Sequence, residues 1–307
     1  MYNCPMHAML GLQITIFSLI AVGFLLRRIH LIDAHGQKQI TDLVLYLVLP
    51  CNIVSSFMQQ DTGDGVWGEI LGIFIISVIL QFFSVAYGKF VFRKEPEDRR
   101  VNLIYATLCS NAGFLGNPIA EGVFGAPGQM LASVYMTPMR IMMWSRGLAL
   151  YSGTVDKKAT VKKVLTHPCV IACFIGIVLL ITGAQLPPFI ETPIQTVGRC
   201  NTALSMLVIG MILSEIEPKS LVDRTVILYT IHRLVILPLI VYLVLLLVPV
   251  TPLVRGVSVL LAAMPAGATT SMLASKYDRD PHFATRLVIF STLCSIPALL
   301  IWSAVLL

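Results

Sequence analysis

Two stretches decide the fold of this chain: Ser110-Asn111-Ala112-Gly113-Phe114-Leu115-Gly116-Asn117-Pro118 and Met264-Pro265-Ala266-Gly267-Ala268-Thr269-Thr270-Ser271. Each places helix-breaking and polar residues inside a segment that is otherwise apolar enough to cross a membrane. Lipid cannot hydrogen-bond to the backbone groups that such residues free, so the irregular backbone must be buried in protein or face a watery cavity. A matched pair of broken helices in the two halves of a chain indicates the substrate site of a secondary transporter.

The composition predicts a polytopic membrane protein. The chain has 307 residues, of which 56% are hydrophobic and 12% charged, whereas soluble domains are about 25% charged. Among its seven cysteines, Cys169 and Cys173 lie one helical turn apart without a second pair of ligands. Neither a zinc site nor a disulfide framework is therefore predicted.

Apolar runs of about 20 residues, separated by polar, Gly and Pro residues, predict ten membrane spans. They cover residues 8–26, 40–58, 69–88, 101–124, 130–150, 168–186, 194–213, 225–248, 253–274 and 283–306. The spans divide into two repeats of five, about 8–150 and about 168–306. An odd number of spans inserts the second repeat upside down. The predicted fold class is an all-α polytopic membrane protein with two inverted five-helix repeats.

The loop charges predict the orientation. All but four of the 22 Lys and Arg residues fall in one alternate set of loops, and the opposite loops 59–68, 125–129 and 186–193 contain none. By the positive-inside rule the basic loops are cytoplasmic and both termini are extracytoplasmic, in the cell membrane. This distribution accounts for the net charge of +6 without a nucleic-acid partner. The four exceptions are Arg140, Arg199, Arg233 and Arg255.

Two of these arginines lie deep inside expected spans: Arg140 near the middle of span 130–150, and Arg233 roughly 13 Å from the cytoplasmic end of its span. A charge at such depth costs several kcal/mol unless it faces protein or water and meets an anion. Two interpretations of Arg140 stay open. It donates to carbonyls freed by the breaks or pairs with Glu121 or Asp42, or it binds an anionic substrate through its planar guanidinium.

Both breaks suit an anion. Proline ends the preceding half-helix, and glycine permits close backbone approach. The following half-helix then presents free N–H groups and a positive dipole end. The predicted substrate-binding residues are Ser110, Asn111, Gly113, Asn117, Pro118, Arg140, Pro265, Gly267, Thr269 and Thr270. No cofactor is predicted, and the coupling ion, proton or sodium, is left open because no pair of carboxylates lies at mid-membrane.

These residues resemble the auxin efflux carrier family, which includes the PIN-type plant hormone carriers and many bacterial transporters. The shared motifs are Ser110-Asn111-x-Gly113-Phe114-Leu115-Gly116-x-Pro118, Phe124-Gly125, Leu49-Pro50, Leu207-Val208-Ile209-Gly210, Met264-Pro265-Ala266, Leu273-Ala274-x-x-Tyr277 and Ser291-Thr292-x-x-Ser295-Ile296-Pro297. They extend over essentially the whole chain. The long cytoplasmic loop of the plant members is replaced by the short segment 152–167, so the chain looks like a bacterial member.

The resemblance implies that spans four and nine cross at Pro118 and Pro265 within one transporter domain, residues 1–307. It implies a scaffold of spans one, two, six and seven, often the interface of a homodimer. Spans three to five and eight to ten would form a moving domain. The implied activity is the transport of small organic carboxylate anions by elevator-like alternating access.

Two other functions are weighed against a carrier. A membrane-embedded ligand sensor on the same fold would bind without net transport, but no signalling domain is evident. An intramembrane enzyme would need reactive motifs, and the chain has no HExxH, GxSxG or P-loop pattern. No enzyme is therefore predicted, and uptake into proteoliposomes separates a carrier from a sensor.

Overall fold

The computed structural model describes residues 6–59, 65–153, 158, 162, 165–214 and 223–306. Within these ranges the regular structure is helical apart from one isolated pair of extended residues, which confirms the all-α prediction. The helices are α1 (Met6–Arg28), α2 (Ala34–Leu43), α3 (Leu49–Met58), α4 (Val66–Val91), α5 (Glu97–Leu108), α6 (Asn117–Met142), α7 (Leu148–Ser152), α9 (Pro168–Thr182), α10 (Pro188–Arg199), α11 (Asn201–Leu213), α12 (Arg224–Ile231), α13 (Leu237–Leu246), α14 (Pro252–Ala262), α15 (Thr269–Lys276) and α16 (Pro281–Leu306).

Helical segments overlap every expected span. By length and composition, five continuous helical stretches in the described residues could cross a membrane unaided: Ala34–Met58, Val66–Val91, Pro188–Leu213, Arg224–Leu246 and Pro281–Leu306. The outward faces of α4 and α9 expose large apolar side chains such as Ile79 and Phe174, as lipid-facing helices do. The chain is therefore organised as a multi-pass membrane protein.

In the part of the chain that the structure describes, four π-helical segments interrupt the helices: η1 (Val44–Val48), η2 (Ala112–Gly116), η3 (Met143–Gly147) and η5 (His232–Ile236). Three of them lead into helices whose second residue is proline: Pro50, Pro118 and Pro238. Proline has no N–H and its ring crowds the preceding turn, so the hydrogen-bond ladder widens locally there. Gly125, with φ of +69°, divides α6 where the sequence predicted a loop, because glycine adopts positive φ without strain.

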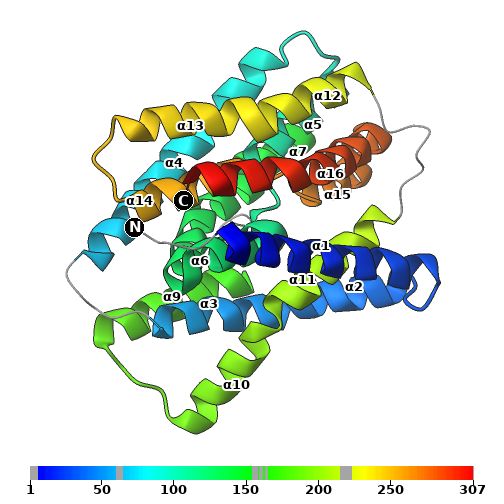
Figure 1. Ribbon diagram of the computed structural model, residues 1–307. Helices are drawn as coiled ribbons and strands as arrows, with labels where there is room; N and C mark the ends of the chain where they lie inside the picture. The colour runs from blue at the N-terminus through cyan, green and yellow to red at the C-terminus, as the bar shows by residue number, and fades with distance from the viewer. Residues whose placement is uncertain are drawn as a thin grey trace.

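The helices form two bundles (Figure 1). The first bundle comprises α1–α3 and α9–α11, in which α1 packs along α11, and α3 packs on α9 and α10. The second bundle comprises α4–α7 and α12–α16, in which α4 packs on α5 and α6, and α16 packs on α12 and α15. Helix α6 also contacts α3, α9 and α11, so it joins the two bundles.

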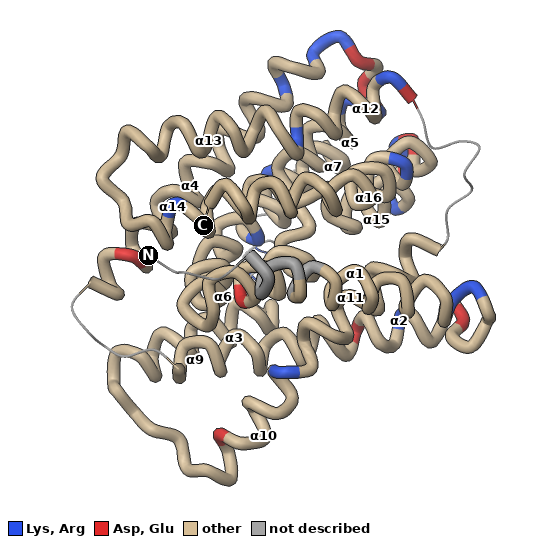
Figure 2. Tube along the Cα trace, viewed as in Figure 1, with Lys and Arg blue, Asp and Glu red and all other residues tan. Residues whose placement is uncertain are grey.

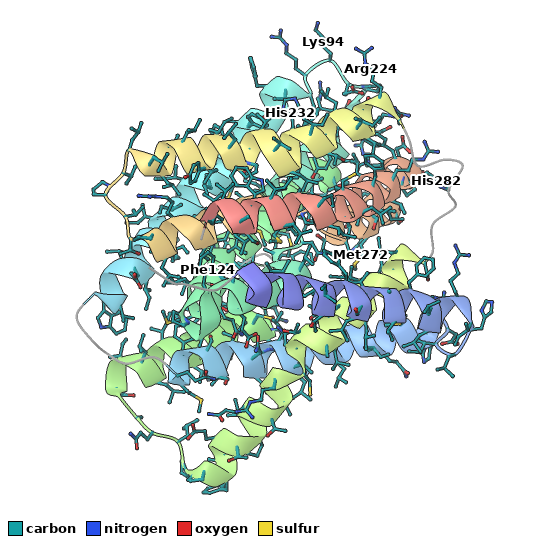
Figure 3. The ribbon with its side chains drawn as sticks, in the orientation of Figure 1. Lys94, Phe124, Arg224, His232, Met272 and His282 are labelled. Atoms are coloured by element: carbon teal, nitrogen blue, oxygen red, sulfur yellow. The ribbon has the colours of Figure 1, made fainter. Side chains whose placement is uncertain are left out.

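Most Lys and Arg residues lie toward one end of the molecule (Figure 2). Lys94 and Arg224 lie together there (Figure 3). At this end Arg99 pairs with Asp223 at 3.0 Å, which ties α5 to α12. Partly exposed ion pairs of this kind contribute about 0–1 kcal/mol each. Several of the predicted cytoplasmic basic residues fall in 154–164 and 215–222, mostly outside the described residues.

Candidate functional site

The two interrupted segments cross and pair through their backbones. Asn111 N donates to Pro265 O at 2.8 Å, and Gly267 N donates to Cys109 O at 3.0 Å. The two hydrogen bonds run in opposite directions, so the segments cross as two very short antiparallel strands. Four backbone groups that the breaks leave without helical partners are thereby satisfied inside the protein, as an apolar surrounding requires.

The crossing lies earlier in the first segment than the sequence predicted. Pro118 and Pro265 were expected to cross, with irregular backbone over Asn111–Pro118. The bridged residues are instead Ser110 and Ala266, and helix resumes with η2, so that Pro118 is the second residue of α6. The physical reason is that proline has no N–H to donate across a crossing, whereas its fixed φ suits the first turn of a helix.

The second break agrees more closely with its prediction. Irregular backbone was expected over Pro265–Thr269, and the backbone is non-helical as far as Ala268, with α15 following. Sequence reasoning missed one support of this break. Ala266 N donates to Ser291 Oγ of α16 at 3.1 Å. Ser291 belongs to a motif of the family resemblance, which was the only signal that could have pointed to it.

A close backbone approach explains the glycine at the second break, and it makes a prediction. A Cβ on Gly267 would lie 3.1 Å from Cys109 O and 3.3 Å from Ser110 O, whereas a Cβ on Gly113 would meet nothing within 4 Å. We expect Gly267→Ala to lower the free energy of unfolding by about 1–3 kcal/mol. Gly113→Ala is the matched control and should stay within about 0.5 kcal/mol of the wild type. Melting temperatures of the purified variants test this, and equal values would contradict the crossing geometry.

Arg233 holds the ends of both interrupted helices. It is buried in η5, where Nε donates to Met264 O at 2.7 Å and Nη1 donates to Thr107 O at 2.9 Å. Tyr229 OH donates to Ala106 O at 2.9 Å beside it. The carboxyl end of a helix carries a partial charge of about −0.5. One guanidinium therefore balances the ends of α5 and α14 together.

Arg233 thus takes the structural role that the sequence offered for Arg140. The depth of Arg233 was predicted from the sequence, but no partner was assigned to this residue. Depth in the membrane could not distinguish the roles of Arg140 and Arg233, since both residues lie far inside their spans. The rotation of each helix decides which guanidinium meets the freed carbonyls, and only the packing of α5, α14 and η5 determines that rotation.

Arg140 lacks a comparable set of partners. Its side chain is 5% exposed, Nη2 lies 3.9 Å from Met136 Sδ, and Nη1 has no hydrogen-bond partner. In the described part of the chain the ion pairs join other residues, so the expected pairing with Glu121 or Asp42 does not occur. A buried guanidinium with unused donors is costly, and an anion would satisfy it.

The position of Arg140 links the crossing to the first bundle. The preceding residue, Met139, accepts a weak hydrogen bond from Ser110 Oγ at 3.6 Å. On the same helix, Thr137 Oγ1 lies 3.8 Å from Cys173 Sγ of α9. Arg140 therefore belongs to the second bundle but lies where that bundle meets both the crossing and α9.

His167 lies within reach of the Arg140 charge. It caps α9, and its Nδ1 accepts from Cys169 N at 3.3 Å. Burial, and then the positive charge of Arg140, lower the pKa of His167 to about 4. The imidazole is therefore neutral at pH 7, and the positive charge in this region belongs to Arg140.

The remaining predicted site residues divide into three groups. Thr269 joins the crossing, with Oγ1 3.3 Å from Cys109 Sγ. Asn117 and Thr270 are fully buried close to the starts of α6 and α15, and neither amide atom of Asn117 nor the Thr270 hydroxyl has a hydrogen-bond partner. Gly113 lies beside open space on η2. Unpartnered buried polar atoms are rare in folded proteins, so these mark places where a ligand or water can bind.

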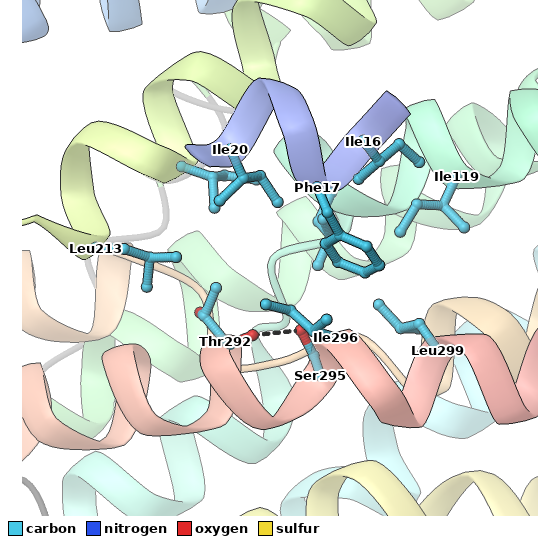
Figure 4. Close-up of a pocket in the computed structure, with 11 residues that line it drawn as sticks. Ile16, Phe17, Ile20, Ile119, Leu213, Thr292, Ser295, Ile296 and Leu299 are labelled. Carbon is cyan, nitrogen blue, oxygen red and sulfur yellow. Dashed lines mark hydrogen bonds between the residues drawn. The ribbon is translucent and has the colours of Figure 1, made fainter. Parts of the chain in front are cut away.

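A small cavity of about 10 Å³ lies between the bundles beside the first break. Side chains of α1 and α16 face one another across it (Figure 4). Its lining is apolar except for the hydroxyls of Thr292 and Ser295, and Ser295 Oγ donates to Thr292 O at 2.7 Å. The lining residues are Ile16, Phe17, Ile20, Leu115, Ile119, Ile209, Leu213, Thr292, Ser295, Ile296 and Leu299.

Broken helices that cross inside an apolar helical fold are typical of secondary transporters, and comparison with known proteins agrees. A family model described as membrane transport protein matches the chain twice, over residues 9–160 and 154–303. The chain belongs to this membrane transport protein family. Because the family includes the auxin efflux carriers, the resemblance seen in the sequence is confirmed.

Two archaeal relatives match nearly the full length of the chain. It is 22% identical over 306 residues to an uncharacterized transporter of Methanocaldococcus jannaschii, which covers 95% of this chain and 97% of the relative. It is 25% identical over 301 residues to an uncharacterized transporter of Methanothermobacter thermautotrophicus, with the same two coverages. Family and relatives together identify a multi-pass membrane transporter. Bacterial origin stays a prediction.

Proposed function

We propose that this transporter is a secondary carrier of small organic anions, and of carboxylates in particular. The observation that carries the proposal is the buried guanidinium of Arg140, whose Nη1 has no partner. A planar guanidinium binds a carboxylate through two parallel hydrogen bonds. The half-helices that begin after the crossing, at η2 and at α15, add positive dipole ends. The predicted substrate-binding residues around the crossing complete the proposed site.

The proposed mechanism is elevator-like alternating access. The first bundle, which contains expected spans one, two, six and seven, serves as the scaffold, and the second bundle carries the substrate. Two features support this division: Arg140 lies where the bundles meet, and the small cavity lies between them beside the first break. The consecutive matches to one family model support an internal repeat. Its inverted orientation is proposed from the five expected spans in each half.

Orientation and assembly follow from the same proposal. The end that carries most Lys and Arg faces the cytoplasm, and α1 begins and α16 ends toward the opposite end (Figures 1 and 2). We therefore propose that both termini are extracytoplasmic. A homodimer through the scaffold helices is proposed, and α10 exposes Phe189 and Ile190 on that bundle.

The test combines binding with flux. Purified protein is screened by thermal shift against mono- and dicarboxylates, amines and neutral sugars, and the compounds that bind are then followed into proteoliposomes. We expect stabilisation by carboxylates only, and uptake of the same compounds. Binding without flux would favour the sensor, and the absence of binding by any carboxylate would refute an organic anion carrier.

A further inference from the structure

An open groove of about 480 Å³ lies where α4, α5 and α7 meet, at the end of the second bundle that carries most of the Lys and Arg residues (Figure 2). Part of its lining is apolar and comes from α5 and α7, including Val101 and Ile104 of α5. The charged residues of the lining are Lys89, Arg93, Glu97 and Arg100. The groove therefore combines an apolar surface with a group of cations.

A close contact between α4 and α5 lies beside the groove. A Cβ on Gly88 would lie 3.2 Å from Ile104 Cα, so the two backbones approach each other there. Val101 and Ile104 are buried next to this contact. A lysine such as Lys89 can lay its apolar stem along such a surface and keep its charged group in water. The packing thus forms the apolar lining and leaves the cations of the groove unused.

The cations of the groove have no anionic partner in the protein. In the described part of the chain, the ion pairs at this end are made by other residues, and Lys89, Arg93 and Arg100 make none. One carboxylate, Glu97, lies in the first turn of α5, where the helix dipole favours a negative charge. Three cations and one anion give the lining a net charge of +2. The groove therefore attracts an anion.

The groove also lies at the boundary of a membrane-spanning helix. Helix α4 is long and apolar enough to cross a membrane, and Lys89 lies in its last turn. Phe82 follows Ile79 by three residues and precedes Lys89 by seven, so the three side chains share one face of α4. All three are exposed. An apolar, lipid-facing surface of α4 therefore leads directly to the cations of the groove.

We propose that this groove binds the headgroup of an anionic phospholipid. The phosphate lies among Lys89, Arg93 and Arg100, since guanidinium groups bind phosphate through paired hydrogen bonds. The acyl chains lie along the face of α4 that contains Ile79 and Phe82. A lipid fits better than a soluble phosphate, because the charged groove continues into this apolar face. Basic pockets at the ends of membrane helices bind anionic headgroups in this way.

The lipid site is separate from the proposed site for the transported anion. Its lining residues lie on α4, α5 and α7 and in the turn after α4, whereas Arg140 lies on α6. The lining belongs to the second bundle, so a bound lipid is carried by that bundle and does not join it to the first. Lipid binding therefore goes beyond the proposed transport of organic anions and does not depend on it.

Native mass spectrometry of the delipidated full chain in detergent tests the proposal. Dioleoyl phosphatidylglycerol is the anionic probe, and dioleoyl phosphatidylcholine is the lipid without net charge. We expect the wild type to bind phosphatidylglycerol more tightly. The triple variant Lys89→Gln/Arg93→Gln/Arg100→Gln should lower this affinity by about tenfold or more. Equal binding of the two lipids by the wild type overturns the proposal.

A second triple variant controls for total charge. Lys38→Gln/Arg224→Gln/Arg286→Gln also removes one lysine and two arginines, and all three lie outside the lining of the groove. We expect this control to keep the affinity of the wild type for phosphatidylglycerol. Equal losses in the two triple variants would show attraction by overall charge and would refute a specific groove.

Glu97→Gln gives an opposite result that misfolding cannot produce. It removes the negative charge of the lining, so the affinity for phosphatidylglycerol should rise by up to about fivefold. Unchanged or weaker binding contradicts the site, even if the triple variant of the groove does not fold.

Competition distinguishes a lipid from a soluble phosphate. A large molar excess of glycerol phosphate should leave phosphatidylglycerol bound, because the apolar face of α4 contributes only to lipid binding. Displacement by glycerol phosphate would show that the groove recognises phosphate alone, and the lipid assignment would be wrong. These measurements use no carboxylate substrate, so their outcome is independent of the carrier proposal.

Discussion

Replacing Arg140 with methionine should abolish tight binding of carboxylates and leave the fold intact. Methionine keeps the length and apolar character of the side chain but removes the guanidinium. Truncating one partner of a buried charged contact costs about 2–5 kcal/mol, which is roughly 30-fold or more in affinity. The Arg140 Nη1 atom has no partner in the protein, so its loss leaves no protein group unsatisfied. Isothermal titration of the monodisperse variant with the carboxylate that stabilises the wild type measures the effect.

Two further variants make this result specific. Arg140→Lys should bind more weakly than the wild type, since an ammonium ion cannot reproduce the bidentate geometry. Arg199→Ala removes an exposed arginine of the first bundle and should leave affinity unchanged. Wild-type affinity in folded Arg140→Met would falsify the assignment of Arg140 to the site. Loss of the fold in that variant would instead support the structural interpretation of this residue.

Replacing Arg233 with methionine should have the opposite outcome, a large loss of stability. Its guanidinium satisfies Met264 O and Thr107 O, and removing it leaves both carbonyls buried without a cation. Breaking a buried charged contact of this kind costs about 3–5 kcal/mol. We expect a clearly lower melting temperature and poor monodispersity in detergent. Arg233→Lys should recover part of the stability, because its ammonium group keeps the positive charge but cannot reproduce both hydrogen bonds of the guanidinium, to Met264 O and Thr107 O.

The two methionine variants serve as controls for each other. Both remove an arginine that is about 95% buried, 5% exposed for Arg140 and 4% for Arg233, from the second bundle. Burial alone therefore predicts the same effect for both. Hydrogen bonding predicts different effects. The donors of Arg233 have protein partners, so its loss should lower stability. Arg140 Nη1 has no partner, so the loss of Arg140 should weaken ligand binding. Equal stability of the two variants would contradict the role of Arg233 at the helix ends.

Much of the fold follows from local sequence. The apolar runs and the two breaks around Asn111 and Pro265 are visible because lipid does not tolerate unpaired backbone groups. The proline-linked π-helical segments also have a local cause, since Pro50, Pro118 and Pro238 each remove one backbone donor. The crossing itself was expected, but its register was not. Pairing of Cys109 with Gly267 joins residues far apart in sequence, and no local signal selects Ser110 over Pro118.

In the candidate site, too, some features follow from local sequence and others depend on contacts between helices. Sequence reasoning selected Arg140 and the polar residues of both breaks as candidates, because charge and hydrogen-bonding capacity at depth are properties of single residues. It left two roles open for Arg140 and assigned none to Arg233, and it did not connect Asn52 with Gln129 and Asn201. Each of those contacts depends on which face of one helix meets another helix.

The sequence by itself determined that this chain spans a membrane, that two of its spans are broken and that arginines lie deep within it. These properties depend on hydropathy, on the missing donor of proline and on position along a helix, which act within a few residues. The tertiary structure alone decided where the breaks cross, which arginine is neutralised by helix ends and which keeps a donor without a partner. Those outcomes depend on helix rotation and on contacts between distant segments, because a buried donor acquires its partner only when the helices pack.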